Sequence, residues 1–144
     1  MHDHLLVAIV VLVALSFDFT NGFHDTANAI ATSVSTHALS PRLAVILSSV
    51  MNFAGAFATL KVAATIGSGV IDPKRFDVTL VMIVSALLGA IAWNLITWYY
   101  GLPSSSSHAL IGGLIGAGIV GLGFEAVNWD VVVSKMLIPL VVSP

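Results

Sequence analysis

The feature that most constrains the fold is a polar segment, NGFHDTANAIATSVST at residues 21–36, placed almost directly after the apolar run LLVAIVVLVALSF. Such an apolar run is typical of a helix inside a membrane, where lipid cannot satisfy a polar group. The polar side chains of residues 21–36 must therefore face water or other parts of the protein. The chain has to fold so that they are covered from lipid.

The rest of the sequence has the composition of a membrane protein. Hydrophobic residues make up 58% of the 144 residues and charged residues 8%, a balance that one soluble core could not hide. Because a spanning helix needs roughly 20 mostly apolar residues, two of the apolar stretches span comfortably and three are short or interrupted. We predict an all-α, polytopic membrane protein with about five hydrophobic segments and broken or re-entrant helices. The apolar stretches cover residues 5–17, 43–70, 78–100, 110–124 and 131–142.

Turn-forming residues divide these stretches. The segment GSGVIDPKRFD at residues 67–77 predicts an aqueous loop, because it combines glycine, Asp-Pro and a charge cluster. We expect one helix break or kink near Asn21 and Gly22 and another at Leu102 and Pro103, where residues that terminate helices interrupt apolar runs. The expected helices then cover residues 5–18, 25–37, 43–66, 78–100 and 109–123.

The polar segment has a helical period. Its polar residues lie three or four positions apart on one stripe, from Asp18 through Asn21, Asp25, Asn28 and Thr32 to Ser35. An intramembrane carboxylate costs at least ~2.5 kcal/mol and indicates a functional site by default. An open backbone at Gly22 would add carbonyl groups that suit cations and N–H groups that suit anions.

Some of these polar residues allow a plainer interpretation. Thr32 and Ser35 are equally compatible with hydrogen bonds that only join helices. His24 could titrate, coordinate an ion or form hydrogen bonds in a packed interior, and the last interpretation is slightly favoured.

A second polar segment, GLPSSSSH at residues 101–108, opens a glycine-rich helix. Proline is favoured at the first helical position and serine at the N-cap, so residues 104–107 are predicted to lie at the helix N-terminus. Such an end offers free N–H donors to an anion. The alternative is that the serines only cap and turn the chain. Small residues four positions apart on the following helix favour close helix packing: Gly112 with Gly116, and Gly113 with Ala117 and Gly121.

Together the two segments, NGFHDTANAIAT and GLPSSSSHALIGG, resemble the paired signatures of the inorganic phosphate transporter (Pit) family, especially its bacterial low-affinity branch. In the first signature, G-A-N-D-V-A-N-A, Phe23 and His24 replace Ala and Asn, and the matching residues are Gly22, Asp25, Ala27, Asn28 and Ala29. In the second, G-x-P-V-S-T-T-H, Ser106 and Ser107 keep the hydroxyl groups, Ser104 replaces Val, and the matching residues are Gly101, Pro103, Ser105 and His108.

The resemblance implies a secondary transporter that moves inorganic phosphate with a coupling cation, either a proton or sodium, across a bacterial inner membrane. Family members carry each signature twice, in inversely oriented halves. Residues 1–144 contain one copy and resemble the N-terminal repeat, so the expected partner is a C-terminal half or a second subunit. We expect neither a cofactor nor a nucleic-acid partner.

The two polar segments are then expected to meet in space, because neither alone offers enough partners for a tetrahedral dianion. Asp25 and Asn28 are predicted to hold the coupling cation, as metal ligands only if that cation is sodium. The predicted phosphate-binding residues are Ser105, Ser106, Ser107, Asn21 and Thr26.

Three alternatives remain. Sulfate or another tetrahedral oxyanion is the second candidate substrate. An intramembrane serine hydrolase built on residues 105–107 and His108 is a distant one, because the sequence has no G-x-S-x-G elbow. A partner subunit that does not itself transport is the third.

Overall fold

The computed structural model describes residues 2–58, 69–72 and 75–142, and its regular elements are all helical. The all-α prediction is therefore confirmed for these residues. An isolated β-bridge joins Ile71 to Val127. The long helices are α1 (His2–Ser35), α2 (Pro41–Ala58), α4 (Leu80–Tyr99) and α5 (Ser106–Leu122). Shorter elements follow: the 3-10 helix η1 (Phe124–Ala126), α6 (Trp129–Val132), the π-helical turn η2 (Val133–Leu137) and α7 (Ile138–Val142).

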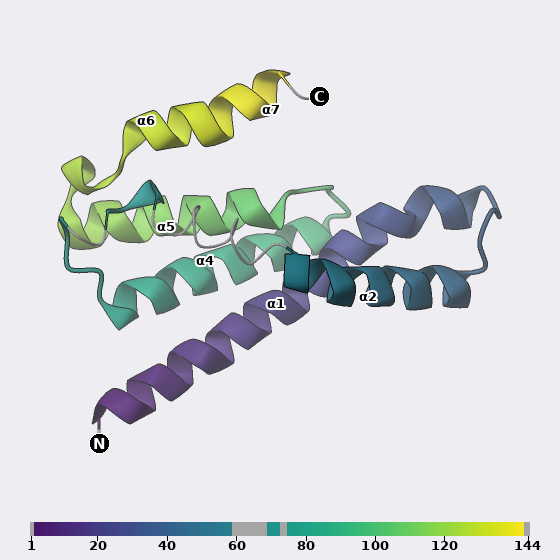
Figure 1. Ribbon diagram of the computed structural model, residues 1–144, viewed down its shortest axis with the longest axis horizontal. Coiled ribbons are helices and arrows are strands. Elements are labelled where there is room, and N and C mark those ends of the chain that lie inside the picture. Colours follow the sequence, from purple (N-terminus) through teal and green to yellow (C-terminus); the bar gives the residue numbers. More distant parts are fainter. Residues whose placement is uncertain (1, 59–68, 73–74, 143–144) are drawn as a thin grey trace.

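The long helices pack as two antiparallel pairs that meet where α1 crosses α4 (Figure 1). After α1, the chain turns back so that α2 lies beside the second half of α1, and α5 likewise turns back along α4. Phe17 packs with Leu87 and Ala90 at the crossing, and Phe23 meets Trp98 edge to face about two turns further on. The crossing therefore brings the start of the polar segment, at Phe23 and His24, against the end of α4.

The predicted break at Asn21 and Gly22 is wrong, because α1 runs without interruption from His2 to Ser35. A kink at the same place stays a prediction. A glycine inside a helix costs about 1 kcal/mol relative to alanine, but it keeps its N–H group and does not by itself open the backbone. The polar side chains find partners sideways, on neighbouring helices, instead of at an opened turn. α1 ends at Ser35, and the chain turns over residues 36–40, where His37 has a positive φ of 57°.

The remaining boundaries follow the sequence more closely. Pro41 begins α2, as expected at a first helical position. The predicted helix over residues 43–66 is confirmed as far as Ala58, and residues 59–66 lie outside the described part of the chain. Residues 67, 68, 73 and 74 of the predicted loop also lie outside the described part of the chain. The second predicted break is confirmed: α4 ends at Tyr99, Gly101 has a φ of +65°, and α5 begins at Ser106.

Backbone contact brings α4 and α5 together through one of the two predicted faces of small residues. A Cβ atom at Gly113 would fall on the carbonyl oxygen of Ala86, and one at Gly121 would lie 3.1 Å from the Sδ atom of Met82. The other face is open, because a Cβ at Gly112 or Gly116 would meet nothing within 4 Å.

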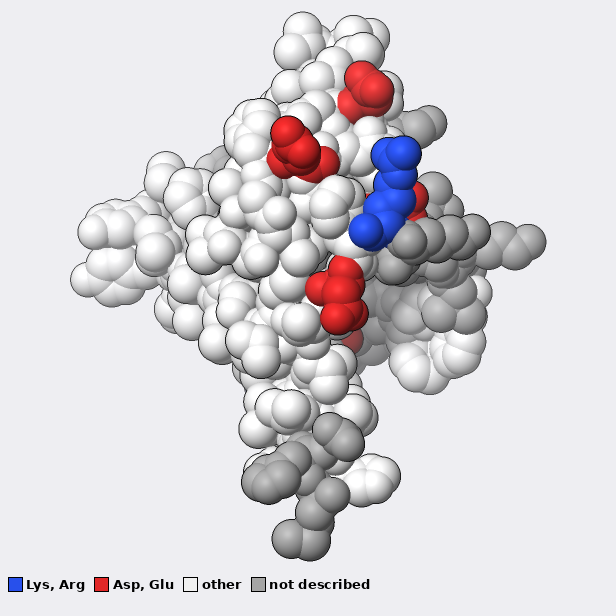
Figure 2. Space-filling model, turned by 90° about the vertical axis from the view of Figure 1, so that its left-hand side faces the viewer, with Lys and Arg blue, Asp and Glu red and all other residues white. Residues whose placement is uncertain are grey.

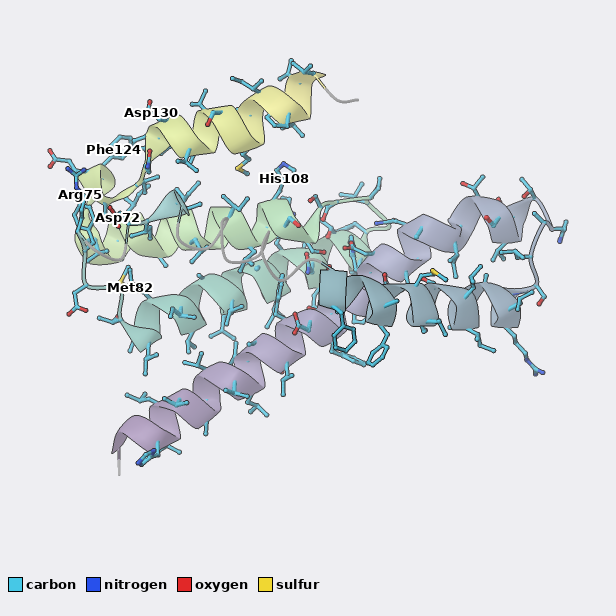
Figure 3. The ribbon with its side chains drawn as sticks, viewed as in Figure 1. Asp72, Arg75, Met82, His108, Phe124 and Asp130 are labelled. Atoms are coloured by element: carbon cyan, nitrogen blue, oxygen red, sulfur yellow. The ribbon has the colours of Figure 1, made fainter. Side chains whose placement is uncertain are left out.

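Charged side chains gather at the end of the molecule where α4 begins and α5 ends. Figure 2 views this end directly, and Figure 3 labels Asp72, Arg75 and Asp130 there. Beneath them, Val70, Ile71, Val127 and Val132 form a buried apolar cluster. α4 itself contains no charged residue.

Two helices are long and apolar enough to cross a membrane among the residues searched, α1 over His4–Ser35 and α4 over Leu80–Tyr99. α2 and α5 are also apolar but shorter, over Pro41–Phe57 and Ser106–Leu122. The final apolar run is helical too. Its widened turn η2 ends two residues before Pro139, a residue that cannot donate a helical hydrogen bond. The number of spanning segments stays a prediction.

Candidate functional site

The two polar segments meet at one hydrogen bond. The hydroxyl of Ser106, in the first turn of α5, donates to Oδ1 of Asp25 on α1 across 3.1 Å. These residues are 81 positions apart in sequence. Ser106 is 2% exposed, whereas the side chain of Asp25 is 49% exposed. The predicted convergence is therefore confirmed, and the carboxylate stands at an open edge of the contact.

His24 connects the same carboxylate to α4. Its Nδ1 lies 3.3 Å from Oδ1 of Asp25, and its Nε2 lies 3.2 Å from the hydroxyl oxygen of Thr97. The ring is 4% exposed, and so it is a packed interior histidine, as favoured from the sequence. Its packing nevertheless places it in direct contact with the main candidate residue.

Thr97 is the centre of the hydrogen bonds on α4. Its hydroxyl donates toward the main-chain carbonyls of Trp93 and Asn94, at 2.9 and 3.1 Å, and lies 3.2 Å from the hydroxyl of Ser104. Thr97 thus contacts α1 through His24 and the α4–α5 connection through Ser104. We call Asn21, His24, Asp25, Asn94, Thr97, Ser104 and Ser106 the polar cluster.

The N-terminus of α5 forms one wall of this cluster. Ser105 is the N-cap, and its side chain accepts a hydrogen bond from the main-chain N–H of His108. The N–H groups of Ser106 and Ser107 then have no acceptor within the helix and stay free for an anion. A groove of about 480 Å³ opens beside this end, lined in part by Ser105, His108 and Trp93. Figure 3 shows His108 pointing away from α4 at this end of α5.

Asn21 and Asn94 hold buried polar atoms about one helical turn before His24 and Thr97. His24 and Thr97 are 73 positions apart, and so are Phe17 and Ala90, which share an apolar cluster. Asn21 and Asn94 have the same separation. Because α1 and α4 run in the same direction, the two asparagines are expected at the same height along the helix pair. Neither polar side-chain atom of Asn94, nor Oδ1 of Asn21, has a hydrogen-bond partner among the described residues. Unpaired buried amide atoms are costly, which favours a polar ligand or water here.

The other predicted residues lie apart from the cluster. Thr26 faces α2, where its hydroxyl oxygen lies 3.5 Å from polar atoms of both Ser48 and Asn52. Asn28 and Ser107 are exposed. The structure thus joins Asp25 to Ser106 and buries Oδ1 of Asn21 one helical turn before Asp25, whereas Thr26 faces α2. The roles assigned to all these residues, including sodium binding by Asp25 and Asn28, stay predictions.

Sequence reasoning missed Thr97 and Asn94. Both lie in WNLITWYY, whose aromatic residues resemble those found at a membrane surface. The missed signal was an Asn and a Thr three positions apart in an otherwise apolar span, since polar residues there usually face the protein interior. No group of three or more His, Asp or Glu residues suited to a metal ion occurs in the described part of the chain.

The comparisons with known proteins agree with the resemblance in the two segments. The profile of the phosphate transporter family matches residues 21–144. A protein of Bacillus subtilis is 56% identical over 140 residues, covering 97% of this chain and 42% of its own length. One from Streptomyces halstedii is 54% identical over 139 residues, covering 96% of this chain and 64% of its own length.

A relative from Mycobacterium tuberculosis is 56% identical over 138 residues, which cover 96% of this chain and 33% of that protein. All three are named "Probable low-affinity inorganic phosphate transporter". The chain thus spans between a third and two thirds of the length of these relatives. No solved structure is significantly similar to it.

Proposed function

Because the chain belongs to the phosphate transporter family, we propose that it forms the N-terminal repeat of a polytopic membrane transporter. That transporter moves inorganic phosphate across the cell membrane together with a cation, by symport. The relatives are named as transporters, which favours transport over catalysis. Sulfate is the alternative substrate, since it is also a tetrahedral oxyanion.

Two features of the surface support a membrane location. Large apolar side chains are exposed along the helices, among them Leu12, Ile46 and Phe53 at 67%, 61% and 71%. An exposed apolar surface of this extent is typical of contact with lipid or with another protein segment. The charged residues at the far end of α4 and α5 suit a position in water at one membrane surface (Figure 2).

The N-terminus of α5 supports the anion part of the proposal. Free main-chain N–H groups and the positive end of the helix dipole attract a phosphate group, and the serine hydroxyls add neutral donors. No lysine or arginine lies in α5. A site built from neutral donors can bind an oxyanion and still release it, as transport requires.

The observation that carries the proposal is the 3.1 Å hydrogen bond between Ser106 and Asp25. It places a carboxylate directly beside the helix end that would receive phosphate. A phosphate bound at this helix end and the Asp25 carboxylate would repel one another unless a cation lies between them. Binding of the cation and binding of phosphate would then favour each other, and this coupling is reciprocal.

The half-exposed Asp25 is compatible with a site that the second repeat completes. We therefore propose a C-terminal half, or a second subunit, as the partner that covers the open edge of the polar cluster. The serine hydrolase alternative has less support: Ser106 donates to a carboxylate, and Ser105 caps a helix.

The test is a fusion of this chain to the remaining C-terminal part of the Bacillus subtilis relative, with the unmodified relative as control. Uptake of radiolabelled phosphate is measured in membrane vesicles under imposed proton or sodium gradients. We expect uptake that depends on one of the two gradients and that excess sulfate does not suppress. A fusion that inserts as well as the control but does not take up phosphate would contradict the proposal. Preferred uptake of sulfate would identify sulfate, and not phosphate, as the substrate.

A further inference from the structure

The strongest further signal is Thr97, which lies outside both signature segments yet contacts one residue from each side of the cluster. We infer that Thr97 is a positioning residue for Asp25, acting through the ring of His24. This inference rests on the proposed function, because Asp25 matters here as the group that receives the coupling cation. We call these three residues the Thr97/His24/Asp25 relay.

The first step is the orientation of the Thr97 hydroxyl. Four polar atoms lie within 3.2 Å of it: the carbonyl oxygens of Trp93 and Asn94, Ser104 Oγ and His24 Nε2. A hydroxyl group has one hydrogen and two lone pairs, so Thr97 can donate to one of these neighbours and accept from others. The two contacts with its own helix limit rotation of the side chain. Thr97 is thus held by α4 and offers His24 a hydrogen-bond partner in a fixed direction.

The second step is the ring of His24. Both ring nitrogens are engaged, Nε2 with Thr97 at 3.2 Å and Nδ1 with Asp25 Oδ1 at 3.3 Å. The ring is also 4% exposed, so packing limits its rotation. Removing the Thr97 hydroxyl would leave a buried ring nitrogen without its partner, and the ring would turn to find another. Such a turn would break the contact with Asp25.

The third step is the carboxylate itself. Oδ1 of Asp25 is held from two sides, by His24 and by Ser106. No hydrogen bond from the described residues reaches Oδ2, and 49% of the side chain is exposed. The relay therefore fixes the carboxylate plane from α4 while Ser106 fixes it from α5, which leaves Oδ2 directed to the open edge for a cation.

Thr97 is also the route by which α4 can act on this carboxylate. α4 contains no His, Asp, Glu, Lys or Arg, so none of its side chains brings a charge to Asp25. Its influence passes through the hydrogen bond to His24. A change at Thr97 should accordingly alter how Asp25 is oriented and leave the charge of the site unaltered.

The experiment uses Thr97→Val in the fusion protein, because valine keeps the shape of threonine and removes the hydroxyl. Phosphate uptake is measured against sodium concentration at constant pH, and against proton concentration at constant sodium. We expect the concentration of the driving cation at half-maximal uptake to rise about three- to tenfold, the value of one hydrogen bond. The maximal rate should change less than about twofold, and Thr97→Ser should restore the unsubstituted curve.

Thr20→Val is the matched control. Thr20 is also buried, and its hydroxyl donates to the carbonyl of Phe17 in its own helix, at 2.9 Å. We expect its cation dependence to equal that of the unsubstituted fusion. An equal shift in Thr20→Val would assign the effect to general destabilisation and overturn the inference.

A second substitution separates the relay from a structural role. In a His24→Gln background there is no ring to position, so adding Thr97→Val should cause no further shift, whereas independent effects would add. An additive shift, or an unchanged cation dependence in Thr97→Val, would overturn the inference. The proposed function is tested separately, by phosphate uptake in the unsubstituted fusion. Should Thr97→Val not reach the membrane, Thr97→Ala carries the same comparison.

Discussion

The helices α4 and α5 are held together in two different ways along their length. In the middle, Gly113 brings the two backbones into contact at Ala86, and toward the charged end Gly121 packs against the side chain of Met82. Toward the other end, where the connection between them lies, side chains do the joining, through Thr97 to Ser104 and through Ser106 to Asp25. The first part is a close apolar contact at glycines, and the second is a set of hydrogen bonds.

The difference indicates which end can respond to a ligand. A backbone contact without side chains has a single close arrangement, because any added atom forces the helices apart. Hydroxyl, imidazole and carboxylate groups can exchange one hydrogen-bond partner for another at small cost. The glycine contact would thus serve as the fixed point from which the polar cluster is held in place and can rearrange.

Asp25→Asn should have the largest effect on transport, because it removes the charge at the polar end and keeps the shape. We expect phosphate uptake by the fusion to fall about a hundredfold, within the range of coupling between linked sites. Insertion and thermal unfolding should be unchanged, since the amide oxygen still accepts from Ser106. Normal uptake with unaltered cation dependence would assign Asp25 a structural role and remove the functional distinction between the two ends.

Gly113→Ala should have the largest effect on stability. The new Cβ would overlap the backbone of Ala86, so we expect a loss of about 1–3 kcal/mol in the free energy of unfolding. Thermal unfolding in detergent measures it, with Gly112→Ala as the adjacent control, where a Cβ meets nothing within 4 Å. Equal unfolding temperatures for both variants would refute the close contact.

Ser106→Ala should have an intermediate effect. It removes the donor to the Asp25 carboxylate, a bond to a charged group worth about 1.5–3 kcal/mol. We expect weaker phosphate uptake and, because that bond orients Asp25, a shift in cation dependence as well. Ser107→Ala, at an exposed position of the same turn, should shift phosphate affinity less and leave cation dependence unchanged. A larger loss of phosphate affinity in Ser107→Ala than in Ser106→Ala would show that Ser106 is not part of the anion site.

Gly116→Ala should have the smallest effect. Gly116 lies on the open face of α5, so the added methyl group meets no neighbour. Because alanine is the better helix former, we expect no loss and a gain of up to about 1 kcal/mol in the free energy of unfolding. Detergent unfolding next to Gly113→Ala provides the comparison. A loss as large as that of Gly113→Ala would mean that both faces of α5 are packed, for example against the proposed second repeat.

Much of the arrangement follows from local residue types. The all-α class, the break before α5 and the meeting of the two polar segments were all predicted, and the structure confirms them for the described residues. Pro103, Gly101 and the serine N-cap act on their own backbone, so their effect does not depend on distant residues. Nothing local in LLVAIVVLVALSF or in Gly22 forces α1 to open, and the break predicted there was wrong.

The sequence by itself determined that residues 21–36 need polar partners, because an apolar helix cannot leave an Asp and several amides against lipid. It did not determine where those partners come from. A helix can satisfy such side chains by opening its backbone or by lying beside another polar helix, and both solutions fit one sequence pattern. Only the crossing of α1 and α4 decided it, since that crossing places Thr97 at 3.2 Å from His24 across 73 residues of chain.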